Sequence, residues 1–188
     1  MILLRVYLLA GLLAHKALWE VLKRKERAEA KPVQSFSLRI VKAAKVALLL
    51  GILVQTVLPF EVLKISPEPF SLRVAGVILY TAGLFTAMLG RIQLGKNWAD
   101  IETPQVEGEI AVVSQGVYRY IRHPIYTGDL LLLLGLELSL NSWFALALVA
   151  LIPVVFQRAV GEEKMLAKRL AGYDSYVQRT KRFIPFVV

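Results

Sequence analysis

The sequence predicts an all-α, polytopic integral membrane protein with about five transmembrane helices. Of its 188 residues, 56% are hydrophobic, and its mean hydropathy is +0.56. Soluble domains of this size contain only about 45–50% apolar residues. The excess lies in long apolar runs, and basic residues collect in alternate connections between them. Both features are typical of a chain that crosses a bilayer several times.

Three apolar blocks occupy the first half of the chain, at about Met1–Leu22, Val41–Leu63 and Val74–Leu94. At about 1.5 Å per residue, each could span about 30 Å of hydrocarbon as a helix. The first block could also be a secretory signal peptide. Its basic residues mostly follow the apolar run and no small-residue cleavage site precedes them, so we expect a retained membrane anchor.

A fourth apolar block, Thr127–Val160, is too long for one crossing, because a single helix of this length would reach about 50 Å. Asn141 and Ser142 near its middle form a turn and helix-capping signal. We therefore expect a helical hairpin with arms Thr127–Leu140 and Trp143–Val160. The first arm is near the lower length limit for a span, so a re-entrant hairpin is the alternative.

Charge predicts the orientation of these spans. The chain has 23 Lys+Arg against 14 Asp+Glu, for a formal charge of +9. The basic residues follow the first, third and fifth predicted spans, as expected for cytosolic loops and for contact with anionic headgroups. The N-terminus should then lie outside and the C-terminus in the cytosol. This bias accounts for the charge without a nucleic-acid partner.

Two polar stretches, residues 95–126 and 158–188, flank the predicted hairpin on the cytosolic side. In the first, Pro124 disfavours helical geometry at His123 and is suited to begin the next helix. Arg122 and His123 would then lie at a helix entrance, where backbone N–H groups and cationic side chains bind carboxylates or phosphates. Basic and aromatic residues also act as simple anchors at headgroup depth, and that interpretation stays open.

In the second polar stretch, Arg158 and Glu162 are four residues apart and would share one face of a helix. Ionisable groups near membrane depth usually face a protein interior or a watery cavity, which favours a site. The alternative is an exposed ion pair of little energetic value. Two further acids, Asp129 and Glu137, fall within the hairpin. Glu137 could line a substrate passage or form a protonated interhelical hydrogen bond.

Two motifs carry a resemblance to a known family. Residues 116–126, GVYRYIRHPIY, are followed after the hairpin by Arg158-x-x-x-Glu162-Glu163. Together they resemble the isoprenylcysteine carboxyl methyltransferase family, which is itself similar to the membrane phospholipid N-methyltransferases. Residues 94–98 (LGKNW), 173–176 (YDSY) and 179–185 (RTKRFIP) match further family motifs. The resemblance covers about residues 90–188, and the first ninety residues match only as hydrophobic helices.

The length suits one structural domain, with the three N-terminal spans in residues 1–90. The resemblance implies a methyltransferase core in residues 91–188. The core would hold S-adenosylmethionine in a cytosol-facing pocket covered by the C-terminal helix. Arg158 and Glu162 would carry the catalytic roles, with Arg158 beside the methyl acceptor. The implied cofactor contacts are the strand-like Ile110, Ala111, Val112 and Val113, then Tyr118, Arg122, His123, Pro124, Ile125, Tyr126, Glu162 and Glu163. Some relatives have a polar residue or histidine at Ile110, so a contact through that side chain would be lost here and one through the backbone kept.

The chemistry leaves the methyl acceptor open. Methyl transfer from a sulfonium needs in-line approach and a water-poor site. A carboxylate acceptor needs only orientation, which a bidentate arginine such as Arg158 provides. An amine must lose a proton, with Glu162 or His123 as the base. The resemblance implies a lipophilic, isoprenylcysteine-like or other lipid acid as the acceptor, with a phospholipid amine as the alternative.

Other classes of function stay open. A non-catalytic scaffold would keep the helices without binding a cofactor. A sterol-reductase-like enzyme is a third class, because some membrane reductases carry a similar RHPxY motif and use NADPH, although this chain has no Gly-rich dinucleotide fingerprint. Two distant histidines and no cysteine give no recognisable metal-ligand spacing, and the lack of cysteine excludes disulfides and thiol catalysis.

Overall fold

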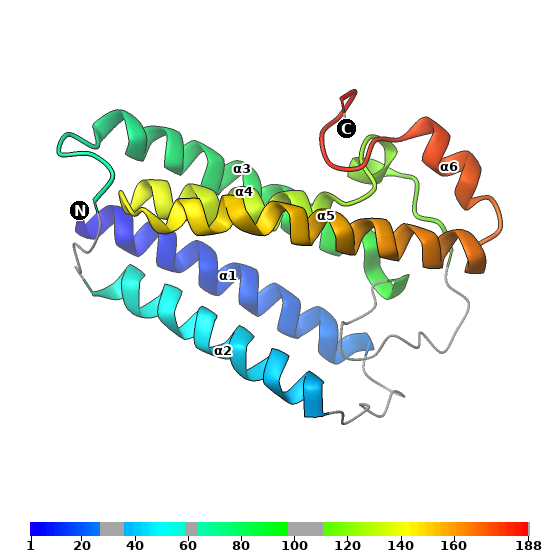
Figure 1. Ribbon diagram of the computed structural model, residues 1–188, viewed down its shortest axis with the longest axis horizontal. Coiled ribbons are helices and arrows are strands. Elements are labelled where there is room, and N and C mark those ends of the chain that lie inside the picture. The colour runs from blue at the N-terminus through cyan, green and yellow to red at the C-terminus, as the bar shows by residue number, and fades with distance from the viewer. Residues whose placement is uncertain (27–35, 59–63, 98–110, 188) are drawn as a thin grey trace. The chain divides into compact units, whose positions relative to one another are not determined.

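The computed structural model describes residues 1–26, 36–58, 64–97 and 111–187. Within these ranges the chain is all-helical and has no strand, as the sequence predicts (Figure 1). The helices are α1 (Ile2–Glu26), α2 (Phe36–Val57), α3 (Phe70–Leu94), α4 (Pro124–Ser139), α5 (Phe144–Arg169) and α6 (Tyr173–Arg179), with short 3₁₀ helices η1 (Gly95–Asn97) and η2 (Gly116–Arg119).

The chain forms two compact units. The first contains Met1–Val62 and Trp98–Glu109, and the second contains Leu63–Asn97 and Ile110–Val188. In the first unit, Arg5 Nη1 donates at 2.8–2.9 Å to three backbone carbonyls at the end of α2, those of Gln55, Thr56 and Leu58. The start of α1 therefore lies beside the end of α2, so the two helices are antiparallel. A cation at this position also interacts favourably with the negative, C-terminal end of the α2 dipole.

Three described helical segments are long and apolar enough to cross a membrane, Ile2–Arg24, Phe70–Asn97 and Phe144–Arg169. They contain the third predicted span in full, and all of the first and fifth predicted spans except the starting residue of each. Val46–Val57 of α2 is a shorter apolar helix. The 16 residues of α4 would extend about 24 Å, which is less than the hydrocarbon thickness of about 30 Å. The spans expected at α2 and α4 therefore stay predictions.

The predicted turn between α4 and α5 is present at Asn141. This residue has φ +59°, a left-handed conformation that asparagine adopts more readily than most residues. Its side chain also exchanges hydrogen bonds with the backbone of Ser66, at 3.0 Å from the Ser66 N–H and 2.7 Å to the Ser66 carbonyl. The hairpin turn is thereby tied to the segment before α3. α5 continues to Arg169, past the predicted end of the span at Val160.

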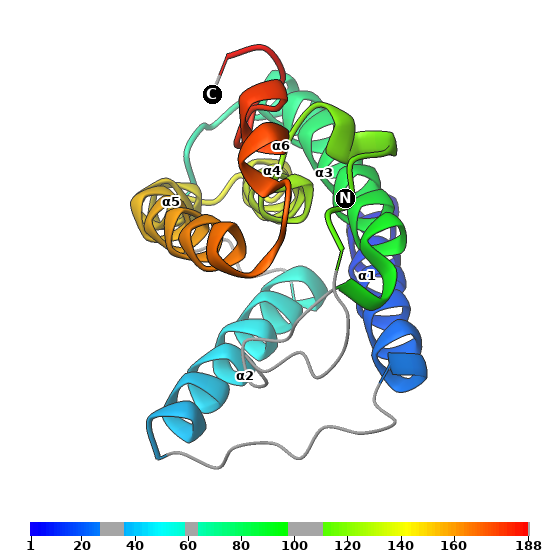
Figure 2. The ribbon, with the colours of Figure 1, turned by 90° about the vertical axis from the view of Figure 1, so that its right-hand side faces the viewer.

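α4 lies between α3 and α5 (Figure 2), and its contact with α3 is made backbone to backbone. Gly76 of α3 faces Gly135 of α4, and Gly83 faces Gly128. A Cβ at Gly83 would lie 2.3 Å from the Leu132 backbone nitrogen, and one at Gly135 would meet the Tyr80 backbone at 2.2 Å. Small residues of this kind let membrane helices pack at close distance.

The α3–α4 contact predicts that Gly83→Ala destabilises the protein by about 1–3 kcal/mol, because the clash is with backbone that no rotamer change can relieve. Gly51→Ala is the matched control, since a Cβ at Gly51 meets nothing within 4 Å. The control should be neutral or stabilising by up to about 1 kcal/mol. Thermal unfolding in one detergent measures both, and equal shifts in Tm would contradict the close packing.

Candidate active site

The RHP segment (Arg122-His123-Pro124) is held in place by α3 and by the start of α4. α4 begins at Pro124 with His123 as its N-cap residue, which confirms the predicted helix entrance. Before it, the Val117 N–H donates to Gln93 Oε1 of α3 at 2.8 Å. Gly116 has φ +58°, and a Cβ there would lie 2.2 Å from the same Gln93 oxygen. Glycine is thus required where the segment approaches α3.

Residues 120–123 pair with residues 181–182, far along the chain. Ile121 and Lys181 form a parallel β-bridge. The Lys181 N–H donates to the Tyr120 carbonyl at 3.0 Å, and the Arg122 N–H donates to the Lys181 carbonyl at 2.8 Å. His123 continues the pairing with a 3.1 Å hydrogen bond to the Arg182 carbonyl. This pairing fixes the segment after α6 beside the RHP motif.

Glu163 of α5 is the centre of a buried charged cluster, which we call the Glu163 cluster (Glu163, Arg122, His123 and Arg182). Arg182 donates to both carboxylate oxygens, at 3.0 and 2.8 Å. Arg122 Nε donates to Oε1 at 2.9 Å, and His123 Nε2 lies 3.0 Å from the same oxygen. The side chains of Glu163, Arg122 and His123 are only 10%, 8% and 6% exposed. The hydrogen bond to Glu163 raises the pKa of the Arg182 guanidinium.

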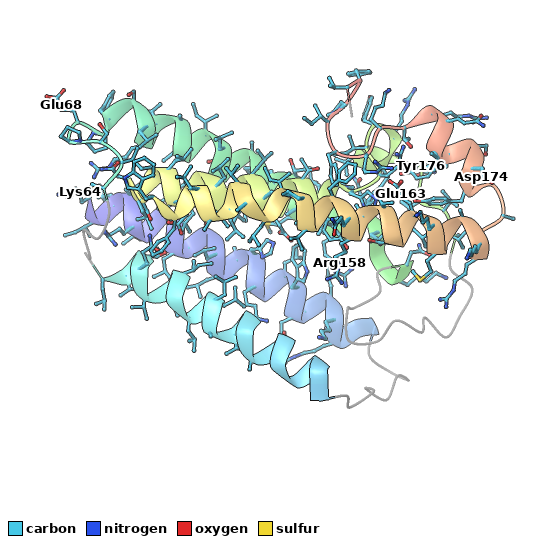
Figure 3. The ribbon with its side chains drawn as sticks, in the orientation of Figure 1. Lys64, Glu68, Arg158, Glu163, Asp174 and Tyr176 are labelled. Carbon is cyan, nitrogen blue, oxygen red and sulfur yellow. The ribbon has the colours of Figure 1, made fainter. Side chains whose placement is uncertain are left out.

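The Glu163 cluster joins three elements. Arg122 also donates through Nη1 to the carbonyls of Val177 and Thr180, which lie in α6 and directly after it. Arg182 adds a cation–π contact, with its guanidinium carbon 4.9 Å from the Phe156 ring centroid on α5. Figure 3 shows Arg158 and Glu163 on the half of α5 that leads to α6, with Lys64 and Glu68 at the opposite end of this unit. The α4 entrance, α5 and the segment after α6 therefore meet at Glu163.

Tyr126 connects Arg158 and Glu162. Its hydroxyl donates to Glu162 Oε2 at 2.9 Å and accepts from Arg158 Nε at 3.3 Å. Arg158 and Glu162 therefore share one face of α5, as predicted. The Tyr126 ring stacks on His123 with centroids 5.4 Å apart and an interplanar angle of 12°. The Glu162 side chain is 39% exposed, so this group borders the Glu163 cluster and is open to a ligand.

Three tyrosines are buried beside the Glu163 cluster. The Tyr176 hydroxyl donates to the Tyr118 carbonyl at 2.9 Å. Burial raises the pKa of Tyr176 to about 12, and it raises the pKa values of Tyr118 and Tyr173 further. All three phenols are therefore neutral hydrogen-bonding groups at physiological pH.

Arg91 of α3 is a site residue that sequence reasoning missed. It is fully buried, donates to the Gly95 carbonyl at 3.2 Å, and its charge lowers the pKa of Tyr118 against the larger effect of burial. In the sequence Arg91 lies within the apolar block expected at Val74–Leu94. A charge inside an apolar run is itself a signal of a polar interior, and that signal was available.

An apolar cavity of about 360 Å³ lies between α4 and α5. Leucines of α4 line it, together with Ile152 and Phe156 of α5 and Phe183 after α6. The Phe183 ring also lies 5.7 Å from His123 and 6.0 Å from Phe156, between ring centroids. The Thr127 hydroxyl is shared between the His123 and Phe183 carbonyls, each at 3.1 Å. The apolar cavity thus adjoins the polar groups at Phe183.

The remaining predicted cofactor contacts are placed as follows. Ile110 lies outside the described residues. Ala111–Val113 form neither helix nor strand, so the strand-like prediction is wrong for them: the Ala111 N–H is bound at 2.8 Å by Asn97 Oδ1 of η1 and not by a neighbouring strand. Pro124 and Ile125 pack against α3 at Gly90.

No hydrogen bond joins Ala111, Val112 or Val113 to the Glu163 cluster within the described ranges. The same described residues contain no group of three or more His, Asp or Glu side chains that could hold a metal ion.

These features define an integral membrane protein with a charged site at one end of an apolar helical hairpin. The model of the phospholipid methyltransferase family matches residues 72–171, which is more than half of the chain and includes most of α3, the RHP motif, α4 and α5. The chain belongs to this family of membrane methyltransferases.

Curated relatives are similar at low identity. A probable protein-S-isoprenylcysteine O-methyltransferase from Oryza sativa subsp. indica is 24% identical over 115 residues, which cover 60% of each chain. Protein-S-isoprenylcysteine O-methyltransferase B from Arabidopsis thaliana is 28% identical over 160 residues, 80% of this chain and 78% of the relative. The cobalt-zinc-cadmium resistance protein CzcN of Cupriavidus metallidurans is 29% identical over 113 residues, 57% of this chain and 50% of its own.

Proposed function

We propose that this chain transfers a methyl group from S-adenosylmethionine to a carboxylate on a lipophilic, isoprenylcysteine-like acceptor. The observation that carries the proposal is the junction at Phe183, where the apolar cavity meets His123, with Tyr126 and its partners Arg158 and Glu162 beside it. A lipid acid needs both environments at once, an apolar recess for its chain and a cation for its carboxylate. The names of the relatives support the same acceptor class.

The residues at the site fit S-adenosylmethionine. Glu162 offers a partly exposed carboxylate for a hydroxyl or ammonium group. The rings of His123 and Tyr126 offer faces to a sulfonium. In the first turn of α4, the N–H groups of Ile125 and Tyr126 have no capping side chain among the described residues and suit a carboxylate. When bound, the cofactor supplies a methyl group on a positively charged sulfur. The contacts proposed from the resemblance include Tyr118, Pro124 and Ile125. Arg122 and Glu163 would act by positioning His123.

Arg158 is proposed to orient the acceptor. Its Nε is bonded to Tyr126, and within the described ranges its two terminal nitrogens make no hydrogen bond, which leaves the fork available to a carboxylate. A bidentate pair fixes both distance and plane. Because a carboxylate has no proton to lose, these side chains need only orient it and keep water away.

The family description favours a second candidate, methylation of a phospholipid amine. Glu162 would then accept the proton that the amine loses. The two candidates differ in pH dependence. The rate with an amine should rise as the amine is deprotonated, whereas the rate with a carboxylate should show only the acceptor's own ionisation at low pH.

We further propose five spans, an external N-terminus and a site that faces the cytosol. The basic residues of the last turns of α5 and of α6 support this orientation, because cytosolic ends of spans carry excess Lys and Arg.

Calorimetry on the detergent-purified protein tests the cofactor. We expect S-adenosylmethionine to bind and NADPH not to bind. Methyl transfer is then measured to a farnesylated cysteine with a free carboxyl, to its carboxamide and to phosphatidylethanolamine. Only the free acid should react. A reaction confined to phosphatidylethanolamine would contradict the carboxylate acceptor and favour the amine candidate. NADPH binding alone would indicate a reductase, and no binding of either would indicate a scaffold.

His123→Ala should weaken S-adenosylmethionine binding by about 1–3 kcal/mol. It removes the imidazole ring proposed to face the cofactor and the buried hydrogen bond to Glu163 that positions this ring. The chain's other histidine, His15, stacks on Trp19 in α1 and provides the control, His15→Ala, which should bind the cofactor normally. Titration calorimetry measures both variants, with Tm to establish folding. Equal affinities in the two folded variants would reduce the RHP motif to an interfacial anchor.

A further inference from the structure

The segment after α6 exposes apolar side chains next to a charged site. Ile184, Phe186 and Val187 are 53%, 83% and 66% exposed, and Tyr120 beside them is 48% exposed. We call these four residues the apolar tip. Phe183, one residue earlier, also lines the α4–α5 cavity, as does Ile184 itself. Large apolar side chains gathered on one surface mark a site of contact with another molecule or a membrane.

The apolar tip is an ordered turn, fixed by a hydrogen bond and by a ring contact. The Val187 N–H donates to the Ile184 carbonyl at 3.2 Å, which closes a turn. Phe186 has φ +67°, an unfavourable conformation for a bulky residue. Its ring meets the Tyr120 ring edge-on, with centroids 6.2 Å apart. Arg182 and the Ile121–Lys181 bridge hold the base of the turn.

The depth of the tip follows from α5. At about 1.5 Å per residue, a helix that starts at Phe144 crosses about 30 Å of hydrocarbon in about 20 residues. Phe156 would then lie about 18 Å along the span, still inside the hydrocarbon. Phe183 packs on Phe156 at 6.0 Å, and Ile184 lines the same cavity as Leu130 and Ile152. On this count Phe156 lies about 12 Å short of the far end of the span, so the tip leaves the protein within the acyl-chain region of its leaflet.

The surroundings of the tip are cationic. Arg119, Arg179 and Lys181 are exposed next to it in the sequence, and residues 171–187 contain one acid, Asp174. Apolar residues flanked by Lys and Arg are suited to an anionic bilayer surface, where rings enter the acyl-chain boundary and cations meet phosphates.

We propose that the apolar tip inserts into the bilayer leaflet on its side of the membrane, with Arg119 and Lys181 on the phosphates of anionic lipids. The partner is the lipid surface itself. The inserted tip braces the 181–187 segment, which lies against His123 and the apolar cavity. This contact is independent of the proposed methyl transfer and would hold for any activity of the site.

The chain has no cysteine, so a single spin label reports one position. The label is placed at Phe186→Cys in the full chain, in nanodiscs of phosphatidylcholine and phosphatidylglycerol. Its accessibility to oxygen, which partitions into lipid, is compared with that to a water-soluble nickel complex. Leu146→Cys, on an exposed position of α5, gives the lipid reference, and Ser175→Cys, on an exposed position of α6, gives the water reference.

The oxygen-to-nickel ratio at position 186 should match that at 146 and exceed that at 175 severalfold. In discs of phosphatidylcholine alone it should fall, because Arg119 and Lys181 lose their anionic partners. A ratio at 186 equal to that at 175 would place the tip in water and overturn the proposal. A label shielded from both reagents would overturn it as well, because protein would then cover the tip. An unchanged ratio in phosphatidylcholine alone would contradict the proposed contact of Arg119 and Lys181 with anionic lipids.

Discussion

Arg158→Lys is expected to lower kcat/KM for the lipid-acid acceptor by about tenfold to a thousandfold, which corresponds to about 1.4–4 kcal/mol of transition-state stabilisation. Lysine keeps the positive charge but presents a single ammonium group, so the bidentate grip on a carboxylate is lost. The 3.3 Å hydrogen bond to Tyr126 that orients the guanidinium is lost too. Initial rates over a range of acceptor concentrations measure the change, and calorimetry should find cofactor affinity little altered.

Arg169→Lys is the matched control, because it makes the same substitution at an exposed position of α5 and should change neither parameter. Tyr126→Phe provides a second comparison. It keeps the ring that stacks on His123 but loses both hydroxyl contacts, so it should impair the acceptor reaction in the same direction as Arg158→Lys and by less. If Arg158→Lys abolished cofactor binding while the acceptor KM stayed constant, Arg158 would belong to the cofactor.

The predictable parts of this molecule are those set by local patterns. Long apolar runs placed α1, α3 and α5, the Asn141-Ser142 pair placed the hairpin turn, and Pro124 placed the start of α4. Each of these signals acts through the backbone within a few residues, so no knowledge of the packed structure is needed to read it.

Such local patterns do not predict that Glu163 is buried and Glu162 is partly exposed. Adjacent residues on a helix point about 100° apart, and the sequence does not say which direction leads inward. The answer depends on Arg182 and Arg122, which reach Glu163 from segments 19 and 41 residues away in the chain. The sequence analysis expects both acids at the cofactor, and that expectation stays a prediction. In the structure both oxygens of Glu163 have protein partners, whereas the Glu162 side chain is 39% exposed.

The glycines of the α3–α4 contact are an intermediate case. Gly76 and Gly83 are seven residues apart, and so are Gly128 and Gly135, which keeps each pair on one helix face. The spacing was visible in the sequence, but it does not identify the partner helix, because any two small-residue faces can pack. Only the assembled unit shows that these two faces meet.

Glu163→Gln is expected to destabilise the protein by about 3–5 kcal/mol, because it leaves Arg122 and Arg182 without a countercharge in a largely buried site. The amide also replaces one acceptor oxygen with an NH₂ group that cannot accept from Arg182. The loss should concentrate at the base of the 181–187 segment, since Glu163 binds Arg182 through both oxygens. Thermal unfolding in detergent measures the total, and amide hydrogen exchange of residues 180–187 should rise before the rest of the unit unfolds.

Glu162→Gln is the matched control, one residue away on the same helix. Its side chain is 39% exposed against 10% for Glu163, and its hydroxyl partner Tyr126 can still donate to the amide oxygen. Stability should therefore fall by no more than about 1.5 kcal/mol, while cofactor binding and turnover should fall clearly. The two variants thus distinguish a residue that stabilises the site, Glu163, from one proposed to contact the ligand, Glu162. If Glu163→Gln kept the wild-type Tm, or if Glu162→Gln were the less stable of the two, the Glu163 cluster would not be what holds the 181–187 segment to α5.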